Sequence, residues 1–157
     1  MAFFGKSKNK DGKSKGPAPA IPPGQVLTLN WTKTPGGKFI RLIDLDPEET
    51  GLSGQGGIYV VWHAGIRPEW VYLGKTKDMG GAMHALARNQ DVMRYDLLGG
   101  LYVTWVIIDE EYWDGALLFL NQKLNPVEDC PDVPTGDDVA PILVTPPGFV
   151  IPILKEE

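Results

Sequence analysis

The stretch GIYVVWHAGIRPEWVYLG, which spans Gly57–Gly74, decides the fold. Its first arm, Ile58–His63, is rich in β-branched and aromatic residues, and so is its second arm, Trp70–Leu73. The residues between the arms include a glycine and a proline, which favour a turn. The stretch therefore predicts two strands joined by a turn, with one tyrosine on each arm.

The composition predicts one domain with tails. The chain has 157 residues and is 43% apolar, which suffices for a core without disulfides or metal. Its one cysteine, Cys130, excludes an intrachain disulfide and a zinc cluster built from cysteines. No apolar run reaches about 18 residues, and no apolar segment of a secretory signal follows the first lysines. We therefore expect a cytoplasmic protein without a membrane span.

The net charge of −5 is unevenly distributed. A basic tail precedes an acidic body, and an acidic body argues against a broad nucleic-acid-binding surface. The segment 1–24 is of low complexity and rich in lysine and proline, so we expect it to be disordered. Its lysines could contact an acidic partner, a membrane face or phosphate, or could simply solubilise the chain. They are Lys6, Lys8, Lys10, Lys13 and Lys15.

The C-terminal part of the chain reads as an acidic, proline-rich linker followed by an apolar arm, over residues 127–157. Three prolines interrupt Ile142–Leu154, so this arm cannot be an inner strand. It is expected to be extended, and either to lie along the body or to dock on a partner. The side chains that would anchor it on a partner are Phe149, Val150, Ile151, Ile153 and Leu154.

The residues between these tails, 25–126, form the predicted domain. Alternating apolar and polar residues in Gln25–Trp31 and Lys38–Leu45 predict an accessory hairpin over residues 25–45. Met79–Gln90 has helical spacing, with Asp78 as a plausible N-cap. The near-continuous apolar run Leu101–Ile108 predicts a central strand.

A second helix, over Glu110–Leu124, follows from the apolar stripe of that segment. The glycine pair Gly80-Gly81 at the start of the first helix suggests close approach by another backbone or by a ligand, or an irregular helix entry. Together the elements predict an α+β fold with a small central, mostly antiparallel sheet flanked by helices.

Two short motifs carry a resemblance to a known family. Gly57-Ile58-Tyr59 lies on the first arm and Tyr72-Leu73-Gly74 on the second, and the order hairpin, helix, strand, helix follows. Over residues 57–126 this arrangement resembles the GIY-YIG nuclease superfamily. The second motif departs from the family's pattern by one conservative change.

The resemblance implies phosphodiester cleavage and a specific set of groups. In that family the two tyrosines lie at the active site, an arginine on the first helix stabilises phosphate charge, and a glutamate on a later helix binds a divalent metal. Here the arginine position falls near Gly80-Gly81 and the glutamate position near Leu117. The sequence therefore predicts a degenerate site that lacks both groups.

Three functions remain open on this basis. The leading one is a non-catalytic structural or protein-interaction module in a larger assembly, with other protein chains as partners and no cofactor. The second is an endonuclease with relocated groups and magnesium as cofactor. Its residues would be Tyr59 and Tyr72 with Lys75 or Arg88 at the phosphate, and Asp114 or Glu111 at the metal. The third is a nucleic-acid binder without cleavage. The two histidines, His63 and His84, could form a metal site or be ordinary half-buried residues.

Overall fold

The structure is a computed structural model that describes residues 25–135 and 138–147. The tail lysines between Lys6 and Lys15 and the arm residues between Phe149 and Leu154 lie outside these ranges. Within the described ranges, no helix has the length and apolar character needed to cross a membrane.

A four-stranded sheet forms the centre of the fold, in the order β2-β5-β3-β4, with every neighbouring pair antiparallel. The strands are β2 (Ile40–Arg41), β3 (Gly57–His63), β4 (Glu69–Thr76) and β5 (Leu101–Val106). Every residue of β3 is buried, since this strand has a neighbour on each side and its β-branched and aromatic side chains face packed layers. The predicted hairpin is β3–β4, and the predicted α+β class is confirmed.

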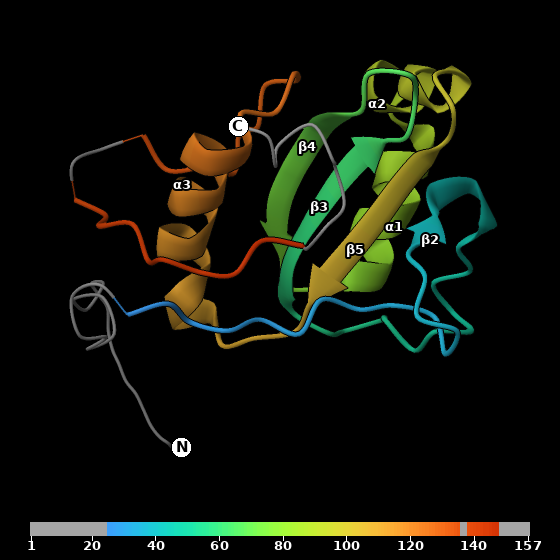
Figure 1. The fold of residues 1–157 in the computed structure, drawn as a ribbon. Helices are drawn as coiled ribbons and strands as arrows, with labels where there is room; N and C mark the ends of the chain where they lie inside the picture. The colour runs from blue at the N-terminus through green and yellow to red at the C-terminus, as the bar shows by residue number, and fades with distance from the viewer. Residues whose placement is uncertain (1–24, 136–137, 148–157) are drawn as a thin grey trace.

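Helices cover both faces of this sheet (Figure 1). α1 (Met79–Arg88) lies on one face and α3 (Trp113–Leu124) on the other. The shorter helical elements are η2 (Leu42–Asp44), α2 (Gln90–Met93), η3 (Arg94–Leu97) and η4 (Glu110–Tyr112). The two predicted helices are therefore present, although the second begins as the separate 3₁₀ turn η4.

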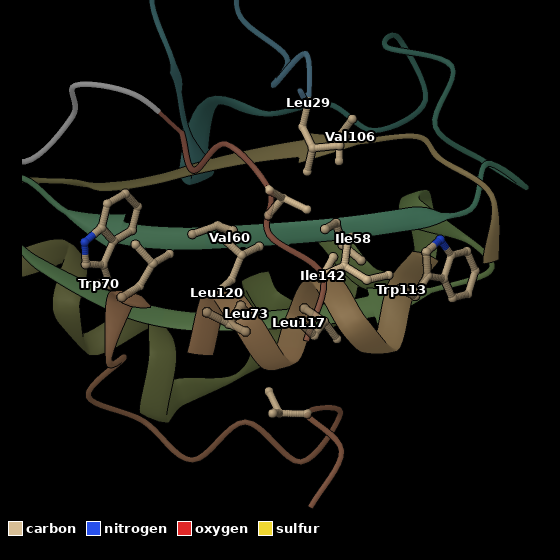
Figure 2. Packing of buried hydrophobic residues seen from close by; sticks show 14 of the residues in the cluster. Leu29, Ile58, Val60, Trp70, Leu73, Val106, Trp113, Leu117, Leu120 and Ile142 are labelled. Carbon is tan, nitrogen blue, oxygen red and sulfur yellow. The ribbon is translucent and has the colours of Figure 1, made fainter. Parts of the chain in front are cut away.

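The core on the α3 side brings strand residues against the apolar stripe of α3 (Figure 2). Ile58 and Leu73 from the sheet and Leu117 from the helix are completely buried. Leu29 and Ile142, which come from opposite ends of the described chain, join the same cluster. This layer therefore depends on residues that are far apart in the sequence.

The core on the α1 side is more local. Its buried members all lie between Leu42 and Trp105 and include Tyr59, Met79 and Met83. Met79 and Met83 are one helical turn apart on α1, so both face the sheet. This layer contains the first tyrosine of the motif.

The two ends of the described chain lie side by side on the α3 face. Leu27 and Val144 form a parallel bridge. The Leu27 amide donates to the Leu143 carbonyl at 2.7 Å, and the Thr145 amide donates to the Leu27 carbonyl at 3.1 Å. The Thr145 hydroxyl accepts the Leu29 amide at 2.8 Å. The chain ends are thus joined by hydrogen bonds as well as by the shared core.

This pairing differs from the predicted accessory hairpin. The turn is present, because the Thr34 amide donates to the Lys38 carbonyl at 2.7 Å. Beyond it, however, β2 pairs with β5, and the segment that contains Leu27 pairs with the C-terminal region instead. Alternation in the sequence indicates an extended conformation but does not identify a partner more than a hundred residues away.

Candidate functional site

The two motif tyrosines lie on the α1 face of the β3–β4 hairpin. Tyr59 pairs with Gly74 across the hairpin, and Tyr72 pairs with Val61, so the two tyrosines are diagonal neighbours. Their ring centroids are 6.3 Å apart and the planes differ by 27°. Tyr59 is only 6% exposed, whereas Tyr72 is half-buried.

Gly74 makes room for the Tyr59 ring. A Cβ atom at this position would lie 2.5 Å from the Tyr59 hydroxyl oxygen and 2.7 Å from the adjacent ring carbon. A Cβ atom at Gly57, at the start of the other motif, would come even closer to the Val106 carbonyl oxygen of β5. Both glycines of the motif are therefore required by packing, independently of any chemistry.

A carboxylate lies beside the tyrosine pair, contributed by the segment that follows α3. This segment runs along the outer edge of β4, where the Leu73 amide contacts the Cys130 sulfur at 3.4 Å and the Lys75 amide donates to Asp132 Oδ2 at 3.1 Å. The same Oδ2 would lie 2.8 Å from a Cβ at Gly74. Asp132 is thus placed next to the Tyr59 hydroxyl.

The surroundings keep the tyrosines protonated. Burial, followed by the nearby Tyr72 and Asp132, raises the pKa of Tyr59 well above its usual range. Burial and then Asp132 also raise the pKa of Tyr72. Burial likewise raises the pKa of the Cys130 thiol. Neither a tyrosinate base nor a thiolate nucleophile is therefore favoured near neutral pH.

The relocated groups proposed for a nuclease do not meet at this pair. Lys75 follows Gly74 in β4, so its side chain leaves from the opposite face of the sheet, where it forms an ion pair with Asp114 of α3 at 2.6 Å. Glu111 is exposed in η4 and Arg88 is exposed at the end of α1. The sheet separates the Lys75–Asp114 pair from both tyrosines.

The two positions that the family resemblance assigns to catalytic groups are filled by packing. A Cβ at Gly80 would lie 3.1 Å from the Ser53 amide nitrogen, because the loop before β3 covers the start of α1. The Gly80 amide donates to the Leu52 carbonyl at 3.0 Å. Leu117 has no exposed surface. Gly80 therefore admits the close approach of another backbone, which is one of the interpretations of the sequence, whereas a Cβ at Gly81 would meet the Asp78 side chain.

Asp78, which precedes α1, also binds the loop that covers the start of this helix. Its carboxylate accepts the Gly54 amide at 2.9 Å, and this hydrogen bond is the largest contribution that lowers its pKa. The Met79 amide donates to the Gln55 carbonyl at 2.7 Å. The first amides of α1 are thus bonded to the preceding loop, which leaves them poorly placed to bind a phosphate.

The histidines do not form a shared site. His63 is buried at the end of β3, where Nε2 lies 2.9 Å from Glu69 Oε1 and Nδ1 accepts the Gly65 amide at 3.2 Å. Its ring stacks on Tyr95 with centroids 5.8 Å apart, whereas His84 is exposed on α1. In residues 25–135 and 138–147, no group of three or more His, Cys, Asp or Glu side chains is arranged to hold a metal ion.

Sequence reasoning missed Asp132 as a neighbour of the tyrosines. The acidic, proline-rich composition after Pro126 reads as a linker, and nothing local in it indicates contact with β4. The available signal was Cys130, a small and frequently buried residue among the acids. A half-buried Cys130 next to β4 would have placed Asp132 at the same strand edge.

Comparison with protein-family models, with curated proteins and with solved structures finds no match for this chain.

Proposed function

We propose that this chain is a non-catalytic structural or protein-interaction module built on a degenerate GIY-YIG-like domain, and that it acts as a component of a larger assembly. The observation that carries the proposal is the filling of both positions where the family resemblance places catalytic groups. Gly80 packs against the Ser53 backbone, and Leu117 lies at the centre of the α3 core.

The chemistry of the tyrosine pair supports the same proposal. Phosphoryl transfer requires a cation to stabilise charge on the phosphate and a base or metal to activate water. Lys75, a candidate cation, is neutralised by Asp114 on the other face, and the raised tyrosine pKa values disfavour a phenolate base. The pair is better suited to hold β3 against β4 than to cleave a phosphodiester.

One observation favours a second candidate function. Asp132 gives the tyrosines a carboxylate that could bind a divalent cation, which makes a metal-dependent endonuclease the alternative. The residues nominated for magnesium from the sequence, Asp114 and Glu111, do not fit that role, because Asp114 is ion-paired across the sheet from the tyrosines.

A cleavage assay separates the two candidates. Purified full-length protein is incubated with single- and double-stranded DNA and RNA in the presence of magnesium or manganese. We expect no cleavage above that of a matched Tyr72→Phe preparation. Metal-dependent cleavage that disappears in both Tyr72→Phe and Asp132→Asn would overturn the proposal in favour of the nuclease.

The interaction role is tested with a truncation that spares the core. Because Ile142 and Val144 are buried, a deletion must begin after residue 147. Full-length protein and a 1–147 form are used to isolate partners from the native source under crosslinking. We expect a defined partner that is recovered with the full chain and reduced with the 1–147 form, and a chain that recovers no defined partner in either form would contradict the proposal.

A further inference from the structure

Two adjoining loops gather exposed aliphatic side chains at the end of the sheet where β3 and β4 are joined (Figure 1). Ile66 in the β3–β4 turn is fully exposed, Leu97 is 87% exposed, and Leu98 beside it is exposed as well. The loops are joined through their backbones, because the Ala64 amide donates to the Gly100 carbonyl at 3.0 Å. Single exposed apolar residues are common, but a cluster on adjoining loops is typical of contact surfaces. We call this surface the tip and define it by Ile66, Arg67, Leu97 and Leu98.

The tip also carries a positive charge. Arg67 follows Ile66 in the turn and is exposed, and it forms no ion pair within residues 25–135 and 138–147. The nearest acid of the same turn, Glu69, is held by the buried His63, with Oε1 2.9 Å from Nε2. An arginine beside apolar anchors is a common composition for the residues that carry binding energy in protein contacts.

A cleft of about 400 Å³ lies beside β2, between the turn that contains Thr34 and the turn that contains Thr50. Its apolar lining comes from Phe39, Ile40 and Leu45, which are half-buried. A cavity of about 150 Å³ accommodates one benzene-sized group. The cleft therefore has room for two aliphatic side chains.

The rim of this cleft has an excess of negative charge. Its charged residues are Asp44, Asp46, Glu49, Lys38 and Arg41. Arg41 is already paired with Asp96 at 3.0 Å, whereas Asp44 and Glu49 are exposed and form no ion pair in the part of the chain that the structure describes. The cleft thus offers an apolar lining and unpaired carboxylates, which complement the aliphatic side chains and the arginine of the tip.

We propose that the tip of one molecule docks in the cleft of a second copy of this chain. Ile66 and Leu97 lie on the apolar lining, and Arg67 pairs with the carboxylates of the rim. The tip does not fill the cleft of its own molecule, since its aliphatic side chains are exposed. The contact joins two different surfaces, and every copy carries one of each. This deepens the proposed function by naming a second copy as a partner, and it rests on that function only for the assembly role.

Sedimentation velocity of the full-length protein, from about 10 μM to about 1 mM, measures the contact. We expect the wild type to self-associate with rising concentration. The tip variant, Ile66→Ser/Leu97→Ser, and the cleft variant, Asp44→Lys/Glu49→Lys, should each weaken this association about tenfold or more. All four side chains are exposed, so both variants should keep the thermal unfolding transition of the wild type.

Two controls at the opposite end of the sheet match these changes. Ile107→Ser removes another exposed aliphatic side chain, and Asp109→Lys/Glu111→Lys alters the net charge as much as the cleft variant does. Both should associate as the wild type does. A wild type that stays monomeric up to about 1 mM would overturn the inference, and so would tip or cleft variants that associate no more weakly than these controls.

An equimolar mixture of the tip and cleft variants tests whether the two different surfaces meet. The tip variant keeps an intact cleft and the cleft variant keeps an intact tip, so the mixture should associate more strongly than either variant alone. With a fluorescent label on the tip variant, the restored species should contain both chains. A mixture that associates no better than its components would overturn the inference. Any of these failures would leave isolation of a different partner by the full chain unaffected, so it is distinct from a failure of the assembly role.

Discussion

The two faces of the sheet are built in different ways. On the α1 face, the buried residues come from one continuous part of the chain, between Leu42 and Trp105. On the α3 face, the core extends from Leu29 to Val144 and joins both ends of the described chain. The motif tyrosines lie on the first face, where the loop that precedes β3 packs against the start of α1. The second face depends on extended segments that lie far apart in the sequence and pair with each other.

The largest predicted effect tests the α3 face. Leu117→Glu places a carboxylate where the family resemblance expects the metal ligand, but the site is a dry core. We expect a loss of about 3–5 kcal/mol in the free energy of unfolding, because no partner for the charge lies within the leucine cluster. Urea unfolding measures it, with the exposed Gln122→Glu on the same helix as control. Stabilisation of Leu117→Glu by magnesium would contradict this view of α3.

A smaller effect is predicted on the α1 face. Gly74→Ala forces the Tyr59 ring to move and should destabilise the protein by about 1–3 kcal/mol. Gly36→Ala is the matched control, because a Cβ there would meet nothing closer than 3.8 Å. Adding Tyr59→Phe to Gly74→Ala removes the closest contact and should recover part of the loss in thermal denaturation. Full additivity of the two substitutions would show that Gly74 does not serve the Tyr59 ring.

The junction of the chain ends should respond more weakly. Thr145→Val removes the acceptor of the Leu29 amide and should cost about 1–2 kcal/mol. Thr145→Ser keeps the hydroxyl and should retain most of the stability. Denaturant titration of the two variants isolates the hydrogen bond from the side-chain volume. Equal losses in both variants would mean that packing of the methyl group, rather than the hydroxyl, joins the two ends.

The sequence predicts the local elements of this fold well and the distant contacts poorly. The hairpin, the central strand and both main helices follow from periodicity within about a dozen residues. The pairing of Leu27 with Val144 does not, because an extended segment accepts any partner of suitable polarity and register. For the same reason the sequence assigned Leu27 to a hairpin with the neighbouring segment.

The candidate site shows the same limit. Tyr59 and Tyr72 are adjacent because a hairpin places them so, and this was predictable from the motif. The position of Asp132 depends on how the chain returns along β4 after α3, which no local pattern specifies. Lys75 and Asp114 were both named from the sequence as candidates, and their actual relation is an ion pair with each other on the far side of the sheet.

The smallest effect at neutral pH is predicted for Tyr59→Phe. The hydroxyl makes no hydrogen bond within residues 25–135 and 138–147, so its removal should change stability by less than about 0.5 kcal/mol. At alkaline pH the two proteins should diverge. The unfolded chain releases a tyrosine proton near pH 10, whereas the folded chain keeps the proton of the buried Tyr59. The folded wild type then binds more protons than the unfolded wild type, so its free energy of unfolding falls as the pH rises.

Tyr59→Phe lacks this contribution and should become the more stable protein by about 1.4 kcal/mol for each pH unit above 10. Urea unfolding of both proteins between neutral pH and about pH 11 measures the difference, and all other tyrosines cancel in the comparison. Parallel curves over this range would mean that the Tyr59 phenol ionises as readily in the folded protein as in the unfolded chain. In that case the phenol could ionise in the folded protein and act as a base, which would favour catalysis on the α1 face.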